Sequence, residues 1–245
     1  MKAAPPFTLV FEDSEIIAVN KASGIATGGD RWDESKLRLD KLVAEAAGIN
    51  VFTVHRIDKE TSGLVVFAKN EAAHRRFSLA FAQRDVVKRY IAVVHGRPPW
   101  KETVCSLPLV SNGNKQHMTI VDKYRGKKSL TRFILIHSAG NYSILEAFPE
   151  TGRTHQIRVH AAALGLPVAC DPLYGRGLQD KPVLLSSIKK NWRGDPFDEK
   201  PILSRLGLHA LELTLPSGSE PLILSAPLPR DMAAAVKQIG KRPIM

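Results

Sequence analysis

Apolar and polar residues alternate with the period of a strand near the start of the chain. Residues 7–11 and 15–20 both show this alternation and flank the polar turn Glu12-Asp13-Ser14, so the pattern predicts a β-hairpin. In residues 35–47 the spacing changes, because leucine, valine and alanine recur every three or four positions until Gly48. That period and the glycine that ends it predict a helix.

Later segments continue this mixture of strands and helices. A compact apolar run at 64–69 predicts a buried strand, and Asn70 is a favourable N-cap for a helix that reaches Gln83. Residues 124–128 are expected to form a basic hairpin tip. Strand hairpins with several packed helices predict an α+β fold rather than regular βαβ alternation. The further strands are expected at 86–95, 118–123, 129–137, 141–148, 208–215 and 222–225, and the further helices at 153–164 and 230–239.

Size and composition indicate one soluble domain. The 245 residues are 44% hydrophobic and 24% charged, without a low-complexity tract or a linker that would separate two domains. The N-terminus lacks a signal-peptide core, and no uncharged apolar run approaches the roughly 18 residues of a spanning helix. Two cysteines, neither in a CxxC pair, exclude a multi-disulfide framework and disfavour a zinc or iron–sulfur site. We therefore expect a single domain, 1–245, in the cytoplasm.

Basic charge is concentrated in one part of the chain. Overall, 35 lysine and arginine residues against 24 acidic residues give a net charge of +11. Residues 83–132 hold 11 basic and three acidic side chains, whereas residues 1–82 have no net charge. Such an excess favours a polyanionic partner, and the block suits a surface that binds phosphates, although surface lysines also serve solubility alone.

The densest polar cluster is at residues 55–63. Asp58 stands there between Arg56 and Lys59, and a carboxylate beside a cation is favoured in its charged form, which suits a nucleophile or a base. A surface turn in which aspartate and serine bond their own backbone explains the same composition. Local composition therefore does not choose between a turn and a catalytic group.

Residues 150–160 and 88–96 form two more candidate clusters. An arginine and histidine at a glycine-led helix start can meet a phosphate or a buried carboxylate. His155 and His160 are five residues apart, so they face different sides of a helix, which argues against paired metal ligands. Tyr90 directly follows two cations on an expected strand, where a flat ring either packs or stacks on an extruded nucleobase.

Together these clusters resemble the motifs of the RluA-type family of pseudouridine synthases. Residues 55–69, HRIDKETSGLVVFAK, resemble the catalytic motif HRLDxxTSG, and residues 151–175, TGRTHQIRVHAAALGLPVACDPLYG, resemble TGRxHQIRxHxxxxGxPIxGDxxYG. Residues 12–24 resemble the opening hairpin of the family, 88–96 its KxYxAxxxG strand and 208–210 its LHA strand. Motifs in this order across most of the chain form a specific signal.

The resemblance implies an isomerase that converts uridine to pseudouridine in RNA and needs neither metal nor cofactor. It implies a mixed, largely antiparallel central sheet flanked by helices around a central cleft. Asp58 matches the essential aspartate, and Arg158 matches the basic residue that pairs with it. Tyr90 matches the tyrosine that packs on the flipped base, and Arg56 the arginine that fills the vacated stack. The expected RNA contacts are Arg56, His55, Thr61, Lys88, Arg125, Lys127, Lys128, Arg153 and His155.

Three positions depart from the family pattern. Ile57 replaces the usual leucine, Ala22 stands where a proline is common, and Cys170 stands where a glycine is common. None is a proposed catalytic residue, so these departures affect details of the loops. Many relatives also carry an N-terminal S4 RNA-binding domain, whereas this chain begins a few residues before the catalytic hairpin. We therefore expect no separate S4 domain. A monomer is the default expectation for the oligomeric state.

Several alternatives stay open. Asp58 can attack the sugar, attack the base or remove a sugar proton, with Arg158 holding it charged and oriented. A non-catalytic RNA-binding or ribosome-assembly module is disfavoured because Asp58, Tyr90 and Arg158 are all present. A metal-dependent nuclease or hydrolase built on Asp58, His55, His155 and His160 is disfavoured by the histidine spacing. The substrate is ribosomal RNA, transfer RNA or both, and residues 176–206 are a specificity loop or a surface excursion.

Overall fold

A computed structural model describes residues 5–29, 37–114, 118–175, 177–178 and 181–240. The chain divides into two compact units. Unit 1 comprises Met1–Arg89 and His209–Pro227, and unit 2 comprises Tyr90–Leu208 and Leu228–Met245. Each unit contains strands with helices packed on them, so the predicted α+β fold is confirmed.

The sheet of unit 1 begins with the predicted hairpin. Asp13 forms its turn, because one carboxylate oxygen accepts the N–H groups of Glu15 at 2.7 Å and Ile16 at 2.8 Å. In sheet order the strands run β1, β2, β4 and β11, with β4 and β11 parallel and the other pairs antiparallel. β3 pairs with β4, and β12 pairs with β11. The bounds are β1 Phe7–Glu12, β2 Ile16–Lys21, β3 Phe52–Thr53, β4 Ser62–Ala68, β11 Leu208–Leu215 and β12 Leu222–Ser225.

Two helices of unit 1 follow the sequence signals closely. α1 (Leu39–Ala47) ends at Gly48, whose φ of 66° is the left-handed conformation that glycine adopts without strain. The first residues of the expected helix, 35–36, lie outside the described part of the chain. α2 (Glu71–Gln83) begins after Asn70, whose side chain accepts the N–H of Ala73 at 2.9 Å, as expected of an N-cap. α2 packs on β4 through a shared apolar cluster.

The main sheet of unit 2 is antiparallel. Its order is β5 (Val87–His95, within this unit from Tyr90), β10 (Tyr142–Pro149), β9 (Thr131–Ala139) and β6 (Glu102–Cys105). The register of β5 on β10 runs without a break from Tyr90 opposite Ala147 to His95 opposite Tyr142. Alternate side chains of β5 therefore point to opposite faces of this sheet.

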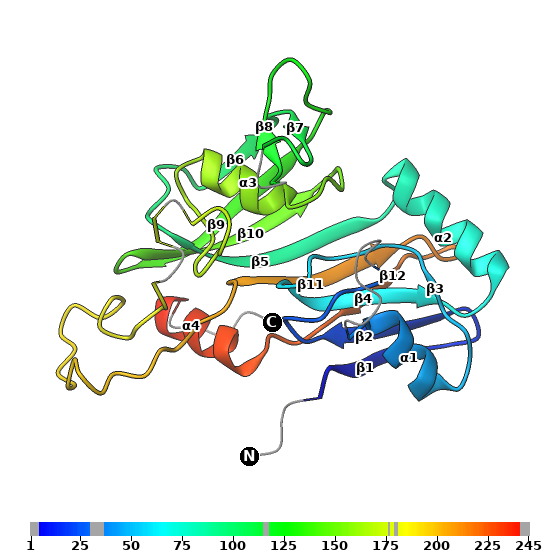
Figure 1. The fold of residues 1–245 in the computed structure, drawn as a ribbon, viewed down its shortest axis with the longest axis horizontal. Helices are drawn as coiled ribbons and strands as arrows, with labels where there is room; N and C mark the ends of the chain where they lie inside the picture. The colour runs from blue at the N-terminus through cyan, green and yellow to red at the C-terminus, as the bar shows by residue number, and fades with distance from the viewer. Residues whose placement is uncertain (1–4, 30–36, 115–117, 176, 179–180, 241–245) are drawn as a thin grey trace. The chain divides into compact units, whose positions relative to one another are not determined.

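Each face of this sheet is covered by a helix. α3 (Gln156–Ala163) packs on the face of Ala92 and Val94, within one buried apolar cluster. α4 (Arg230–Gly240) contacts β9 and β10, and its Gly240 lies close to Ile144, on the face opposite to α3. Figure 1 shows the two helices on different sides of β9 and β10.

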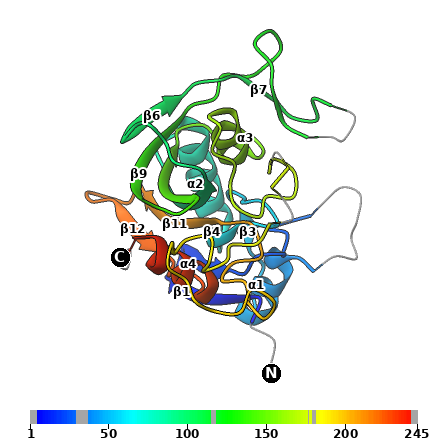
Figure 2. The same cartoon turned by 90° about the vertical axis from the view of Figure 1, so that its left-hand side faces the viewer.

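The expected hairpin between residues 118–123 and 129–137 is wrong. β8 (Ile120–Val121) pairs with β7 (Leu109–Val110), and β9 pairs with β6 and β10. The basic segment 124–128 is a turn in which Lys127 exchanges backbone hydrogen bonds with Leu109. Local patterns cannot identify β7, because two residues carry too little periodicity, and so the partner strand was missed. Figures 1 and 2 both place β7 beside α3.

Within the described residues, the helices are too short or too polar to span a bilayer.

Candidate active site

The loop that carries Asp58 is fixed through its main chain. The carbonyl of Lys59 accepts hydrogen bonds from the Lys21 ammonium at 3.0 Å and the Gly24 N–H at 2.9 Å. The hydroxyl of Ser23 donates to the carbonyl of Glu60 at 2.6 Å. Lys21 is 1% exposed, and its ammonium also donates to the carbonyl of Ala22 at 2.9 Å, so carbonyl oxygens solvate its buried charge. The segment after β2 thus holds the loop on the C-terminal side of Asp58.

Thr27 fixes the residue on the other side of Asp58. Its hydroxyl donates to the carbonyl of Ile57 at 2.9 Å and lies 3.3 Å from the Ile57 N–H, which donates to it. The N–H of Thr61 closes a turn on the carbonyl of Asp58 at 3.1 Å. The Asp58 side chain is half-buried and Arg56 is exposed. Main-chain contacts therefore set the position of Asp58, and the sequence did not reveal Lys21, Ser23 and Thr27 as their source.

The serine and glycine that follow Thr61 have structural roles. Gly63 has a φ of 116°, and a Cβ there would lie 2.2 Å from the carbonyl oxygen of Ala210, so the close approach of β4 and β11 requires glycine. The Ser62 hydroxyl lies 3.0 Å from Nδ1 of His209, and Nε2 of His209 lies 3.1 Å from the carbonyl of Ala226. Since a carbonyl only accepts, Nε2 carries the proton and Nδ1 accepts from Ser62. The TSG and LHA motifs thus meet through this histidine.

His55 is held as a neutral ring. Its Nε2 accepts the N–H of Val66 at 2.9 Å, and the ring stacks on Phe81 with centroids 4.5 Å apart. Burial, with a further contribution from Lys88, lowers the pKa of His55 to about 3. A role of this ring in RNA contact stays a prediction, and at neutral pH the contact would involve an uncharged imidazole.

Lys88 and Thr61, two other expected RNA contacts in unit 1, differ in exposure. Lys88 is half-buried, and burial followed by the charge of Arg84 lowers its pKa. Thr61 is 1% exposed, and its hydroxyl has no hydrogen-bond partner among the described residues. Their contacts with RNA stay predictions.

Arg158 lies on α3 in a buried ion pair that was not predicted. Its Nε donates to Oδ2 of Asp171 at 2.8 Å and its Nη2 donates to Oδ1 at 2.7 Å. Arg158 is 2% exposed and Asp171 0%. The Asp171 carboxylate also accepts the N–H groups of Leu173 and Tyr174, and the Tyr174 ring lies 5.1 Å from Cζ of Arg158. The guanidinium is therefore held in one orientation.

The residue before Asp171 explains one departure from the family pattern. Cys170 has a φ of 56°, which is left-handed and favours glycine. Its thiol donates weakly to the carbonyl of Leu203 at 3.5 Å. This left-handed φ is one that glycine adopts without strain, which fits the glycine that is common at this position. Ala22 has a comparable explanation, because its N–H donates to the carbonyl of Pro6 at 2.9 Å, a bond that proline could not make.

Tyr90 is half-buried at the start of the unit 2 part of β5. It packs against the apolar cluster that includes Ala147, its partner on β10, and Ile157 of α3. Unit 2 thus places Tyr90 and the helix of Arg158 on the same face of one sheet. Asp58 belongs to unit 1, and its proximity to these two residues stays a prediction.

Polar residues of the 151–160 segment form a buried network. Gln156 accepts the Thr151 hydroxyl at 2.7 Å and donates to the Thr131 hydroxyl at 2.9 Å, which in turn lies 2.9 Å from Nδ1 of His160. The other ring nitrogen of His160 donates to the carbonyl of Leu107. Both ring nitrogens of His160 are thereby engaged. Among the described residues, no group of three or more histidine, cysteine or acidic side chains could hold a metal ion.

The expected RNA contacts of unit 2 surround the basic turn. Lys127 and Lys128 are exposed, and Arg125 is exposed beside Asp122, its ion-pair partner at 2.8 Å. Arg153 donates from Nε and Nη2 to the carbonyl of Lys128, both at 3.3 Å, so the turn is fastened to the segment before α3. His155 Nδ1 lies 2.8 Å from the hydroxyl of Tyr174. Their contacts with RNA stay predictions.

Comparison with known proteins decides the family. Residues 15–163 match the family model described as RNA pseudouridylate synthase. The chain belongs to the RNA pseudouridylate synthase family. Ribosomal large subunit pseudouridine synthase D of Zymomonas mobilis subsp. mobilis is 33% identical over 244 residues, which cover 96% of this chain and 73% of that protein. Ribosomal large subunit pseudouridine synthase C of Vibrio vulnificus is 32% identical and covers 94% of this chain and 69% of that protein.

Solved structures agree with this placement. The human RNA pseudouridylate synthase domain containing 1 is 27% identical, with a TM-score of 0.72, and the match covers 94% of this chain and 87% of that chain. The predictions of an RluA-type family member and of an isomerase acting on RNA are therefore confirmed. The matched region of this synthase includes Asp58, Tyr90 and Arg158, whose roles in the reaction stay predictions.

Proposed function

We propose that this synthase converts uridine to pseudouridine in ribosomal RNA and that Asp58 is its catalytic group. Ribosomal RNA is proposed because the relatives from Zymomonas and Vibrio are described as ribosomal large subunit synthases. Transfer RNA is the alternative substrate. The proposal includes one catalytic domain, 1–245, monomeric and cytoplasmic, that acts without a metal.

The reaction exchanges one bond between base and sugar for another. The N1–C1′ bond breaks, the uracil turns, and C5 bonds to C1′. The hydrogen on C5 leaves as a proton and N1 gains one, so the product is an isomer of the substrate. A carboxylate serves this chemistry as a nucleophile toward sugar or base, or as the base that removes a sugar proton.

The fixed loop around Asp58 is the observation that supports this role most directly. Hydrogen bonds to the carbonyls of Ile57, Lys59 and Glu60 hold the main chain on both sides of Asp58. A catalytic group must be held close to its reactive geometry, and a loop fixed by main-chain contacts meets that need without engaging the exposed side chains beside it.

Arg158, Tyr90 and Arg56 complete the proposed site. Asp171 fixes the orientation of the Arg158 guanidinium, and Arg158 would hold the Asp58 carboxylate charged and oriented. Tyr90 would stack on the extruded uracil. Arg56, which is exposed next to the Asp58 loop, would fill the vacated stack and offset an extrusion cost of a few kcal/mol.

Tritium release from RNA labelled at C5 of uridine tests the catalytic role. Asp58→Asn is expected to abolish release while RNA binding stays about unchanged, because the amide keeps the shape and loses the reactive carboxylate. Asp85→Asn, at an exposed acidic position of the same unit, is the matched control and should remain active. Full turnover by Asp58→Asn would remove Asp58 from this role.

The substrate and the absence of a metal need separate measurements. Sequencing of carbodiimide-modified RNA, with and without the protein, should reveal pseudouridines missing from ribosomal RNA in its absence; loss confined to transfer RNA would contradict the ribosomal assignment. Activity should persist in EDTA, and a loss restored by a divalent ion would contradict the metal-free mechanism.

A further inference from the structure

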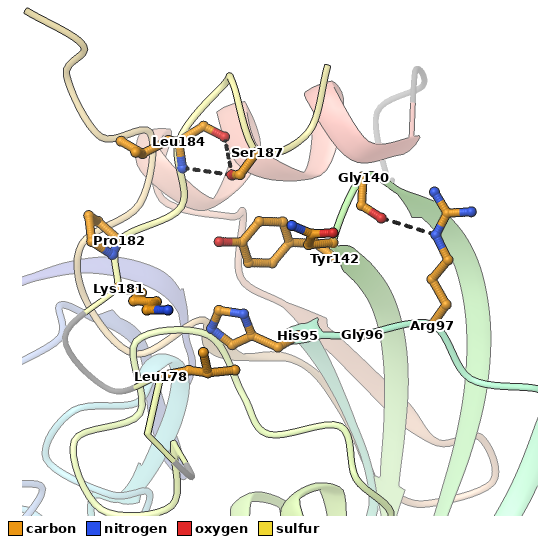
Figure 3. Close-up of a pocket in the computed structure, with 11 residues that line it drawn as sticks. His95, Gly96, Arg97, Gly140, Tyr142, Leu178, Lys181, Pro182, Leu184 and Ser187 are labelled. Atoms are coloured by element: carbon orange, nitrogen blue, oxygen red, sulfur yellow. Dashed lines mark hydrogen bonds between the residues drawn. The ribbon is translucent and has the colours of Figure 1, made fainter. Parts of the chain in front are cut away.

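Unit 2 contains a pocket of about 600 Å³ at the end of β5 distant from Tyr90. Its walls come from the turn after β5, the turn between β9 and β10, Leu178 and the segment 181–187. Figure 3 shows the rings of His95 and Tyr142 projecting from neighbouring strands into this space. Its volume is within the range of roughly 300–1,000 Å³ typical of small-molecule sites.

The pocket is separate from the residues proposed for catalysis in the same unit. His95 and Tyr90 lie five positions apart on an unbroken strand, so their side chains leave opposite faces of the sheet about 17 Å apart along it. Tyr142, opposite His95, shares its face. α3, which carries Arg158, packs on the Tyr90 face.

The walls of the pocket are fastened to each other. The N–H of Asn141 donates to the carbonyl of Ser187 at 3.2 Å, and a Cβ at Gly140 would lie 2.1 Å from that oxygen. The Ser187 hydroxyl donates to the carbonyl of Leu184 at 2.6 Å. The N–H of Val183 donates to the carbonyl of Leu203 at 2.8 Å. Residues 183–187 are therefore fixed beside the turn between β9 and β10.

One buried polar atom in this pocket lacks a partner. His95 is 7% exposed, and its Nε2 has no hydrogen-bond partner among the described residues. Burial and the nearby charge of Lys181 lower the pKa of His95, so the ring is neutral near pH 7. A buried imidazole nitrogen costs free energy until it is bonded, and a ligand in the pocket would supply that bond.

The charges around the pocket select an anion. Arg97 and Lys181 are exposed, and no acidic side chain stands among the described residues that line the pocket. Figure 3 places these two cations on opposite sides of His95 and Tyr142. Leu178, Pro182 and Leu184 supply apolar lining. The pocket thus combines two separated cations with apolar lining and a hydrogen-bonding ring.

We propose that this pocket binds one unpaired nucleotide of an RNA strand, with its flanking phosphates at Lys181 and Arg97 and the polar edge of its base at His95. A nucleotide within a strand carries a phosphate on each side, which matches two separated cations. The polar edge of a base can bond the unpartnered Nε2 of His95, whose ring packs on the buried ring of Tyr142 with centroids 4.9 Å apart. The site would give the 176–206 segment a role in substrate binding.

Titration with uridine 3′,5′-bisphosphate, the smallest mimic of such a nucleotide, tests the proposal. The full chain carrying Asp58→Asn is used, so the result does not depend on catalysis. Saturable shifts of the His95 and Tyr142 ring resonances are expected, and the bisphosphate should bind about tenfold more tightly than uridine 5′-monophosphate or inorganic phosphate. Equal affinity for inorganic phosphate, or shifts confined to Tyr90 with His95 unmoved, would overturn it.

Substitutions then locate the binding. Lys181→Gln should weaken bisphosphate binding about fivefold to tenfold, because one charge-assisted contact is lost. Lys189→Gln, at an exposed position of the same segment outside the pocket, is the matched control and should bind like the parent protein. His95→Phe keeps an aromatic ring and removes Nε2, so it should weaken binding while the circular dichroism spectrum stays unchanged. Equal effects of Lys181→Gln and Lys189→Gln would mean non-specific attraction and contradict the proposal.

A short single-stranded oligoribonucleotide distinguishes a strand from a single nucleotide. The oligonucleotide should shift the same His95 and Tyr142 resonances and compete with the bisphosphate. If only the bisphosphate reached the pocket, a site for RNA would be excluded. Either result leaves the tritium-release test of Asp58 unaffected, so the two proposals can fail independently.

Discussion

The loop of Asp58 in unit 1 and the helix of Arg158 in unit 2 are positioned by opposite means. Around Asp58, side chains from Lys21, Ser23 and Thr27 hold main-chain atoms, while the side chains of Arg56 and Lys59 are exposed and that of Asp58 is half-buried. The Arg158 side chain, by contrast, is itself enclosed, 2% exposed and bound at two nitrogens by Asp171.

This difference shows how a motif can combine two demands. A group that reacts with a substrate needs access, so its loop is fastened from behind through carbonyl oxygens. A group that orients another residue needs only a fixed direction, so it can be buried in an ion pair. Removing the ion-pair partner of Arg158 in unit 2 should therefore mainly lower stability. Removing an anchor of the Asp58 loop in unit 1 should mainly lower turnover.

The largest effect is expected from the buried ion pair. Asp171→Asn keeps an acceptor for the N–H groups of Leu173 and Tyr174 but removes the charge that faces Arg158, and it should lower the free energy of unfolding by about 3–5 kcal/mol. Urea denaturation measures this loss. Asp231→Asn disrupts the half-exposed pair with Arg205 in the same unit and should cost about 1 kcal/mol or less. Similar losses for both variants would contradict the importance of burial.

A series of glycine-to-alanine variants tests the close approach of β4 and β11 in unit 1 through the free energy of unfolding. Gly63→Ala combines a left-handed φ of 116° with a clash against Ala210 and should cost about 3 kcal/mol. Gly24→Ala has a φ of 88° in open space and should cost about 1–2 kcal/mol from backbone strain alone. Gly152→Ala, with open space and no left-handed φ, is the control and should change the unfolding free energy little. Equal losses of unfolding free energy in Gly63→Ala and Gly24→Ala would rule out a contribution from the clash with Ala210.

The pH dependence of stability tests the neutral ring of His55. Its pKa is about 3 in the folded protein against 6.5 in the unfolded chain, so the unfolded state binds more protons as pH falls below 6.5. Stability is unaffected above this pH and decreases between about pH 6.5 and pH 3. Near pH 5 the loss should reach about 2 kcal/mol. Unfolding of His55→Phe should lack this part of the slope, and an unchanged slope would contradict the assignment.

The smallest change in stability is expected from Ser23→Ala, which removes the hydrogen bond to the carbonyl of Glu60. It should cost about 1 kcal/mol and lower kcat with little change in KM, because the loop of Asp58 loosens. Ser138→Ala loses its hydroxyl contact with Ser143 in unit 2 and is the control for a stability loss without a change in turnover. If both variants lowered kcat equally, the loop anchor would have no special role in catalysis.

Local signals predicted the elements well where a segment carried its own boundary. Asn70 marks the start of α2 and Gly48 the end of α1. The apolar run of β11 likewise predicts a strand from nearby residues alone. β6 and β7 were missed, because strands of four and two residues carry too little periodicity to be recognised without their partners. The basic turn was assigned the wrong partner for the same reason.

The candidate site shows the same limit. Motif resemblance identified Asp58, Tyr90 and Arg158, but the atoms that position them come from distant segments. Asp171 was visible within the motif, yet its two contacts with Arg158 depend on how α3 meets the loop after it. Lys21 carried no signal of burial, because a lysine at the end of a strand is usually exposed.

The main-chain fastening of the Asp58 loop also makes it a convenient site for a probe. Lys59 contributes its carbonyl to the anchor while its own side chain is exposed. The two cysteines of the chain, Cys105 and Cys170, are both buried. A Lys59→Cys protein would therefore accept a thiol-reactive fluorophore one residue from the proposed catalytic carboxylate, and the arrival and departure of RNA could be timed there without altering the carbonyl that holds the loop.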